Sequence, residues 1–372
     1  MNVPIVKTAA EIIRTASPEH PADSVLRNVL KKKSGLLRLE SREISRAVFS
    51  YYRWLGWLNT TAPIEEQITE AGQLALRFSH DPAAISDAIK AVPSWTRECL
   101  VLSPAWLSTL QQEPTLWLRT HRGSAQELLA KLNSSKAGPL PDSIEFQGET
   151  DLFRTAEFHD GKFELQDINS QAVGMICDPQ PGETWWDACA GEGGKTLHLS
   201  DLMGNKGLIW ATDKVEWRLK QLKLRAGRAH CFNYRAKVWQ GLGTLPTKTL
   251  FDGVLLDAPC SGIGTWQRNP HARWTTMLKD VNELADLQRD LLMQASAAVK
   301  IGGRLIYSVC TLSRQETEAI ANDFDKAHPE YEPAPFSNPF SPSTAKVTRL
   351  VLWPQDNRGN GMFIAVWKRM AK

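Results

Sequence analysis

Residues 184–196 read Thr-Trp-Trp-Asp-Ala-Cys-Ala-Gly-Glu-Gly-Gly-Lys-Thr, and a helical pattern follows them. The first four residues predict a short apolar strand that ends in Asp187, and the loop after it holds glycines at 191, 193 and 194. Glycine lets the backbone turn sharply and lets a ligand approach it closely. A strand, a glycine-rich turn and a helix in this order favour a nucleotide-type cofactor site over a tight turn without a ligand.

Strands and helices continue to alternate after this loop. The further apolar strands are predicted at 207–213, 251–257 and 304–309. Alternation of this kind predicts a doubly wound, mostly parallel α/β sheet, with ligands bound beyond the carboxyl ends of the strands. Because Asp187, Asp213 and Asp257 each end a strand, we expect their carboxylates at one crevice. Asp213, about 20 residues beyond the loop, is placed to hold ribose hydroxyls.

The loop fits neither of two common phosphate-binding patterns. Ala188 stands where the P-loop needs its first glycine, and Gly-Glu-Gly-Gly-Lys does not match G-x-G-x-x-G. At this point the cofactor is either NAD or S-adenosylmethionine.

Two cysteines bear on that choice. Cys260, in Asp-Ala-Pro-Cys-Ser-Gly, and Cys310, in Tyr-Ser-Val-Cys-Thr-Leu-Ser, each follow a predicted strand. A lone cysteine there is more often buried and inert, but two at equivalent strand ends beside a glycine-rich loop indicate reactive thiols. An NAD oxidoreductase is the poorer alternative, because it leaves both thiols unexplained.

Composition describes an ordinary globular protein. The 372 residues carry 44 Lys+Arg and 41 Asp+Glu, a formal charge of +3, so any nucleic-acid surface must be local. No apolar run reaches the length of a membrane span, and the first residues lack the apolar core of a signal peptide. Six scattered cysteines predict neither a disulfide framework nor a metal site. We expect a cytoplasmic monomer without a membrane partner.

Sequence texture predicts three domains. They are a helical segment at 1–90, a small α+β module at 91–177 and a catalytic domain at 178–372. In the first, apolar residues recur at helical spacing over 41–58. In the second, we expect a strand at 117–120 and a hairpin turn at Asp160-Gly161.

Cations gather in two places. The first group is Arg27, Lys31, Lys32, Lys33, Arg38, Arg42, Arg46 and Arg53, opposed between its ends only by Glu40 and Glu43. A solvated face is the ordinary interpretation, and an RNA-contacting face is favoured if the enzyme acts on nucleic acid. The second group, Arg268, His271 and Arg273 beside Trp274, mixes cations with an aromatic ring as single-stranded RNA sites do.

Three motifs together resemble one family. They are DACAGEGGKT (187–196), DAPCSGIGTWQRNP (257–270) and YSVCTLSRQETE (307–318). In this order they resemble the RsmB/Sun-type RNA (cytosine-5) methyltransferases, which have a Rossmann-like catalytic domain. Residues 1–90 more loosely resemble the NusB-like helical domain of the bacterial members.

The resemblance implies specific roles. Cys310 would be the nucleophile, Cys260 would help release the product, and the charge of Lys195 would favour the Cys310 thiolate. Asp257 would act as an acid at the cytosine ring nitrogen. The residues expected to bind S-adenosylmethionine are Cys189, Ala190, Gly191, Glu192, Gly193, Gly194, Lys195, Asp213, Gln240 and Asp257. Of these, Gln240 stands where the family usually has an aspartate at the adenine.

The sequence therefore predicts methyl transfer to carbon 5 of a cytosine in RNA, with ribosomal RNA as substrate. The expected RNA-binding residues are Lys31, Lys32, Lys33, Arg268 and Arg273. A transfer-RNA methyltransferase is one alternative. A non-catalytic RNA-binding or ribosome-assembly factor with the same fold is another, which the change at Gln240 would suit.

Overall fold

Eight strands form one large sheet among residues 3–33, 36–241 and 243–371, the part of the chain that the computed structural model describes. The strands are β5 (Thr184–Asp187), β6 (Leu208–Asp213), β7 (Tyr234–Val238), β8 (Phe251–Asp257), β9 (Val299–Val309), β10 (Tyr331–Pro333), β11 (Arg349–Leu352) and β12 (Met362–Arg369). Their order is β10-β12-β9-β8-β5-β6-β7, with β11 paired to β12. Neighbours from β7 to β9 are parallel, and β12 is antiparallel to β9. The predicted strands are thus confirmed, while β7 and β10 to β12 went unpredicted.

The central strand β5 is buried on both faces. Trp185 and Trp186 are each fully buried, and successive side chains of a strand point to opposite faces. The neighbouring strand leaves room for one ring, because a β-carbon on Gly253 would lie 2.3 Å from Cζ2 of Trp185. A strand that is apolar on both sides requires helices on both faces of the sheet.

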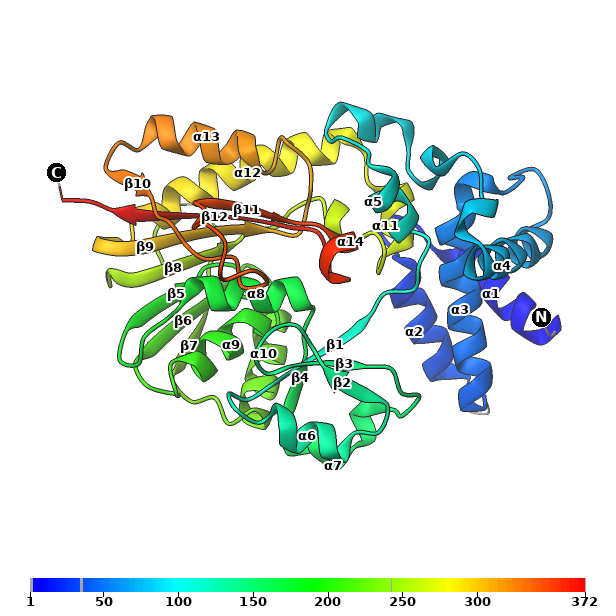
Figure 1. The fold of residues 1–372 in the computed structure, drawn as a ribbon, viewed down its shortest axis with the longest axis horizontal. Coiled ribbons are helices and arrows are strands. Elements are labelled where there is room, and N and C mark those ends of the chain that lie inside the picture. Colours follow the sequence, from blue (N-terminus) through cyan, green and yellow to red (C-terminus); the bar gives the residue numbers. More distant parts are fainter. Residues whose placement is uncertain (1–2, 34–35, 242, 372) are drawn as a thin grey trace. The chain divides into compact units, whose positions relative to one another are not determined.

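Helices cover the two faces, as Figure 1 shows. The large sheet belongs to one of two compact units of the chain. The helices of this unit are α6 (Ala125–Lys131), α7 (Ala156–His159), α8 (Ile168–Cys177), α9 (Gly194–Leu202), α10 (Glu216–Arg228), α12 (Leu278–Ser296), α13 (Glu318–Ala327) and α14 (Pro354–Asn357), with a 3₁₀ turn η5 (Leu152–Arg154). Helices α12 and α13 pack on the face of Trp186, and α8 and α9 pack on the face of Trp185.

A second, antiparallel sheet belongs to the same unit. Its strands are β1 (Leu116–Thr120), β2 (Ser135–Ala137), β3 (Ser143–Phe146) and β4 (Phe163–Leu165), in the order β2-β3-β1-β4. The predicted strand at 117–120 is confirmed. The hairpin predicted at Asp160-Gly161 is wrong, because α7 precedes β4 there and β4 pairs with β1.

The other unit is helical. Its elements are α1 (Val3–Thr15), α2 (Ala22–Lys32), α3 (Arg38–Trp54), η1 (Leu55–Trp57), α4 (Ile64–His80), η2 (Pro82–Ala84), η3 (Ala88–Ala91), η4 (Ser94–Glu98), α5 (Pro104–Thr109), η6 (Ile263–Thr265) and α11 (Pro270–Thr275). The helical spacing over 41–58 corresponds to α3 and the 3₁₀ turn after it. No helix among the described residues has both the length and the apolar character needed to cross a membrane.

The two compact units divide the chain differently from the three predicted domains. One unit consists of the described residues of 1–114 and 262–281, and the other of those of 115–261 and 282–372. The helical unit therefore takes in a segment of the predicted catalytic domain, and the small sheet joins the catalytic sheet instead of forming its own domain.

Arg273 explains why the segment 262–281 belongs to the helical unit. Its side chain is fully buried, and its guanidinium donates to the carbonyl oxygens of Arg53, Ala91, Leu110 and Trp266. Burial lowers the pKa of Arg273 to about 9. The prediction that Arg273 binds RNA is corrected, because its guanidinium is buried among backbone carbonyls, where a phosphate cannot reach it. Trp274 likewise donates to the Tyr52 carbonyl oxygen, at 2.6 Å.

Candidate active site

A cavity of about 300 Å³ lies where β5, β6 and β8 end. Its lining residues are Ala188, Cys189, Ala190, Gly191, Asp213, Lys214, Arg218, Trp239, Gln240, Gly241, Asp257, Ala258, Pro259, Leu287 and Leu291. Six of the residues predicted to bind the cofactor are therefore brought together. Glu192, Gly193, Gly194 and Lys195 are not among the lining residues. The apolar wall from Leu287 and Leu291 was missed, because α12 reaches this place only through tertiary packing.

The glycine-rich loop is held by Asp213. The Gly191 N–H donates to Oδ2 of Asp213 at 3.0 Å, and the Val215 N–H donates to Oδ1 at 2.8 Å. Gly193 has φ +86°, and a β-carbon there would lie 2.6 Å from Cγ of Leu222. The sharp turn thus needs glycine at 193 for its backbone and for its packing.

Asp187 does not share the crevice with the other two strand-end acids, which corrects the expectation for it. It is fully buried, and its Oδ2 accepts a hydrogen bond of 2.6 Å from the Thr196 hydroxyl. Burial raises the pKa of Asp187 to about 7. Its role is inside the fold, below the loop, whereas Asp213 and Asp257 face the cavity.

The two predicted thiols meet. Cys260 follows β8 and Cys310 follows β9, and their sulfur atoms are 3.4 Å apart. Both side chains are partly exposed. The parallel pairing of β8 with β9 brings their carboxyl ends to the same edge of the sheet, as predicted from the sequence. In contrast, burial raises the pKa of the Cys189 thiol, which makes Cys189 a poor rival as nucleophile.

An ion pair lies beside the thiols. Nζ of Lys195 is 2.6 Å from Oδ2 of Asp257, and the Ser308 hydroxyl donates to Oδ1 at 2.7 Å. Burial alone would lower the pKa of Lys195, but the charge of Asp257 and the hydrogen bond to it, together with the charge of Cys310, raise it. Lys195 is therefore a cation within electrostatic reach of the Cys310 sulfur.

A buried carboxylate, Glu316, ties the two cysteine loops together. Its Oε1 accepts from the Ser261 N–H at 2.8 Å, and its Oε2 accepts from the hydroxyls of Ser261, Thr311 and Ser313. Ser261 follows Cys260 directly, and Thr311 follows Cys310. Gln288 of α12 donates to Oε1 at 3.0 Å. Sequence reasoning gave Glu316 no role, although its carboxylate lies within the second cysteine motif, six residues after Cys310, and was the available signal.

The predicted RNA-binding residues lie in the helical unit. Lys31 and Lys32 are exposed, whereas Nζ of Lys33 lies 3.4 Å from a carboxylate oxygen of Glu11. Arg268 lines a hollow of about 570 Å³. The other lining residues are Leu30, Arg38, Ser41, Arg42, Ser45, Arg46, Phe49, Arg53, Glu113, Pro114 and Asn269. We call this hollow the arginine groove.

Comparison with known proteins defines the class. The sequence profile of the family described as 16S rRNA methyltransferase RsmB/F matches residues 174–368, more than half of the chain. The chain therefore belongs to this methyltransferase family. Membership confirms the predicted family and S-adenosylmethionine as the cofactor. The elements described above confirm the Rossmann-like fold and the helical region that precedes it.

Individual relatives agree with the family. A "Probable ribosomal RNA small subunit methyltransferase B" of Synechocystis is 38% identical over 275 residues, which are 69% of this chain and 61% of that protein. A "Ribosomal RNA small subunit methyltransferase B" of Escherichia coli O6:K15:H31 is 30% identical over 75% of this chain and 67% of its own. The chain thus spans less than two thirds of the length of the Synechocystis relative.

A solved structure shares the fold. The crystal structure of PH0851 superposes with a TM-score of 0.82 at 22% identity, covering 99% of this chain and 100% of that one. At this identity the likeness supports the fold alone.

The residues of the cavity fit S-adenosylmethionine. The Asp213 and Asp257 carboxylates can accept hydrogen bonds from ribose hydroxyls and favour a cationic ligand. Trp239 and the two leucines of α12 offer apolar surface to an adenine ring. The Gln240 amide can both donate to and accept from adenine. A β-carbon on Gly191 would meet no atom within 4 Å, so that side of the loop is open to a ligand.

We expect Glu316→Ala to lower the free energy of unfolding by about 3 kcal/mol, because it leaves several buried donors without an acceptor. Urea unfolding followed by fluorescence measures this change. The Glu316→Ala substitution should also lower the rate of methyl transfer, since the two cysteine loops lose their common anchor.

Glu318→Ala is the matched control. Glu318 forms a partly exposed ion pair with Arg349 at 2.7 Å, so its removal should change stability by less than about 1 kcal/mol. Equal effects of the two substitutions would contradict the role given to Glu316.

Proposed function

We propose that this chain transfers a methyl group from S-adenosylmethionine to carbon 5 of a cytosine in RNA, and that ribosomal RNA is the substrate. One observation carries the proposal: the Cys260 and Cys310 sulfurs lie 3.4 Å apart beside the Lys195–Asp257 ion pair. Two adjacent thiols with a cation and a carboxylate suit covalent catalysis on a pyrimidine ring. An enzyme that acts as a cytoplasmic monomer is part of the same proposal.

The Cys310 thiol makes carbon 5 of the cytosine reactive. Carbon 5 of cytosine is a weak nucleophile, and addition of the Cys310 thiolate to carbon 6 breaks the aromatic system and turns carbon 5 into an enamine-like centre. The Lys195 cation lies within electrostatic reach of the Cys310 sulfur, and a nearby cation suits a thiolate nucleophile. When bound, the cofactor supplies the electrophilic methyl group to carbon 5.

Asp257 and Lys195 supply the proton that the ring nitrogen of cytosine takes up. Addition at carbon 6 pushes negative charge onto the ring, and the proton shared between Nζ of Lys195 and Oδ2 of Asp257 can be donated to the ring nitrogen. The Ser308 hydroxyl fixes the orientation of the other oxygen of Asp257.

Cys260 acts after methylation. A base must remove the proton from carbon 5, after which the bond between carbon 6 and the Cys310 sulfur breaks and aromaticity returns. The short distance between the sulfurs supports a role for Cys260 in this elimination. Because the ring must be reached from its face, the target base has to be unpaired or flipped.

The arginine groove supports an RNA substrate. Arg53 lines it, is 6% exposed, and its Nε has no hydrogen-bond partner among the described residues. Burial lowers the pKa of Arg53 to about 10. The arginines that line the hollow give it positive charge, which attracts the phosphate groups of RNA.

For the thiols, we expect Cys310→Ala to abolish methyl transfer and to form no covalent RNA complex. Cys260→Ala should accumulate a covalent protein–RNA complex, because the adduct forms but is not resolved. Denaturing gels with labelled ribosomal RNA and the methyl donor detect it. A complex that forms with Cys310→Ala instead would reverse the two roles.

For the substrate, bisulfite sequencing of RNA from a strain that lacks the gene should show one or more lost 5-methylcytosines in ribosomal RNA. Re-expression of the wild-type chain should restore them, and re-expression of Cys310→Ala should not. Loss of 5-methylcytosine only from transfer RNA would identify transfer RNA as the substrate instead. No loss at all would favour an assembly factor over an enzyme.

For the groove, the double substitution Arg42→Ala/Arg46→Ala should weaken RNA binding about tenfold and flatten its salt dependence, because phosphate contacts release counterions. Fluorescence anisotropy over a range of salt concentrations measures both effects. Arg77→Ala/Arg97→Ala removes the same charge from exposed positions outside the groove and should leave binding near wild type. Equal losses in both pairs would leave only a general charge effect.

A further inference from the structure

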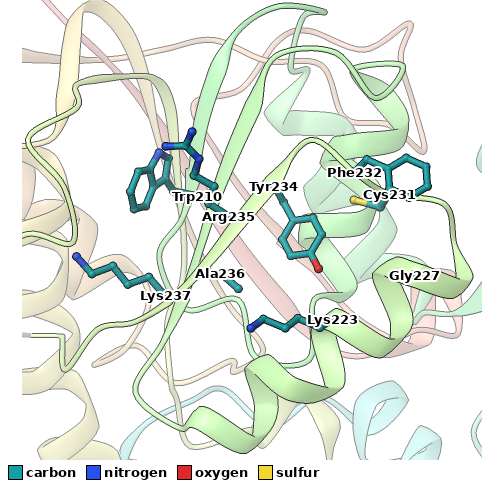
Figure 2. Close-up of a pocket in the computed structure, with 9 residues that line it drawn as sticks. All are labelled: Trp210, Lys223, Gly227, Cys231, Phe232, Tyr234, Arg235, Ala236 and Lys237. Atoms are coloured by element: carbon teal, nitrogen blue, oxygen red, sulfur yellow. The ribbon is translucent and has the colours of Figure 1, made fainter.

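A second hollow lies on the edge of the large sheet (Figure 2). It has a volume of about 640 Å³ and is lined by Trp210, Lys223, Gly227, Cys231, Phe232, Tyr234, Arg235, Ala236 and Lys237. None of these residues lines the cofactor cavity. Strand β7 is the last in the strand order, so the hollow surrounds an edge strand whose outer side pairs with no other strand that the structure describes. The residues of the hollow have no part in the chemistry described above.

Both sides of β7 carry aromatic and basic groups together. Figure 2 shows Trp210 and Arg235 on one side of the strand, and Phe232 and Tyr234 on the other. The guanidinium carbon of Arg235 is 5.8 Å from the centre of the Trp210 ring, a cation–π contact. Phe232 is 71% exposed, so most of its ring surface faces solvent.

The surrounding segment is strongly basic. Between Lys214 and Lys237 there is one acid, Glu216, and eight cations: Lys214, Arg218, Lys220, Lys223, Arg225, Arg228, Arg235 and Lys237. Several of these are neutralised, since Arg225 and Arg228 pair with Glu164, and Lys220 pairs with Glu216.

The cations that line the hollow are not neutralised. Lys223, Arg235 and Lys237 form no ion pair with any residue that the structure describes. These cations therefore lie beside Phe232, which is exposed, and Tyr234, which is half-buried. Helix α10 links this place to the reaction centre, because its Arg218 lines the cofactor cavity and its Lys223 lines the hollow.

A partner for this surface must be anionic and must present flat apolar faces. Single-stranded RNA has both: its phosphates pair with cations, and its bases stack on aromatic rings. A protein strand added to the edge of β7 fits less well, because charged side chains on an edge strand oppose such pairing.

We propose that this β7 edge surface, made of Lys223, Phe232, Tyr234, Arg235 and Lys237, binds a single-stranded segment of the RNA substrate. Bases stack on Phe232 and Tyr234, and phosphates contact the cations. The inference rests on the proposed function for its RNA substrate, and it adds a contact in the catalytic unit to the arginine groove of the helical unit.

The test measures binding of a fluorescein-labelled single-stranded RNA of mixed sequence to the full chain at several salt concentrations. Lys223→Ala/Arg235→Ala should weaken binding about tenfold and reduce the slope of log K against log salt by about 1.4, since each phosphate contact on a single strand contributes about 0.7. Phe232→Ala should weaken binding to a similar extent without changing the slope, because stacking releases few counterions.

A matched control removes two cations from the other end of the same sheet. Lys326→Ala/Lys368→Ala alters exposed side chains on α13 and β12 and should bind RNA as the wild type does. All variants should bind S-adenosylmethionine with wild-type affinity by calorimetry, which shows that the catalytic unit is intact.

Photo-crosslinking tests the contact without substitution. RNA containing 4-thiouridine should crosslink to the tryptic peptide Ala229–Arg235, which holds Phe232 and Tyr234. The inference would be overturned if Lys223→Ala/Arg235→Ala bound RNA with wild-type affinity and slope and the wild-type chain gave no crosslink in that peptide. The proposed function would then remain in place. No RNA binding by the wild-type chain would overturn both.

Discussion

The placement of the two cysteine loops depends on one buried carboxylate. Glu316 accepts hydrogen bonds from the residue after Cys260 and from the residue after Cys310, and so fixes two loops that begin on different strands. Removing a carboxylate from water is costly unless its oxygens are satisfied, and here hydroxyl, amide and backbone donors satisfy them. The distance of 3.4 Å between the two sulfurs follows from this shared anchor as well as from the pairing of β8 with β9.

The sheet decides where that anchor can act. Because β5 is apolar on both faces, it must lie inside a sheet with helices on both sides, and loops at its carboxyl end are left at the surface. The same edge therefore gathers the glycine-rich loop, Asp213, Asp257 and both thiols. Buried Asp187 shows the limit of this logic, since a strand-end acid reaches the crevice only if its side chain points there.

Charge is distributed locally in this chain. The net charge is only +3, yet the helical unit has the arginine groove and the β7 edge has basic side chains without ion-pair partners among the described residues. Arg273 marks the contrast: it has the same chemistry as the groove arginines, but its two terminal nitrogens donate to backbone carbonyls within the fold. Whether an arginine serves the fold or a ligand depends on which acceptors surround it.

The sequence by itself determined the alternation of strands and helices, the glycine-rich loop after β5, and the two cysteine motifs at the ends of β8 and β9. These are local patterns, set by propensity and by the spacing of apolar residues. Only the tertiary structure decided that residues 262–281 join the helical unit, that Arg273 is buried, that Leu287 and Leu291 wall the cofactor cavity, and that Glu316 anchors both thiol loops. These features depend on contacts between residues far apart in the chain. A local pattern can mark a residue such as Glu316, but it does not show which distant residues that side chain contacts.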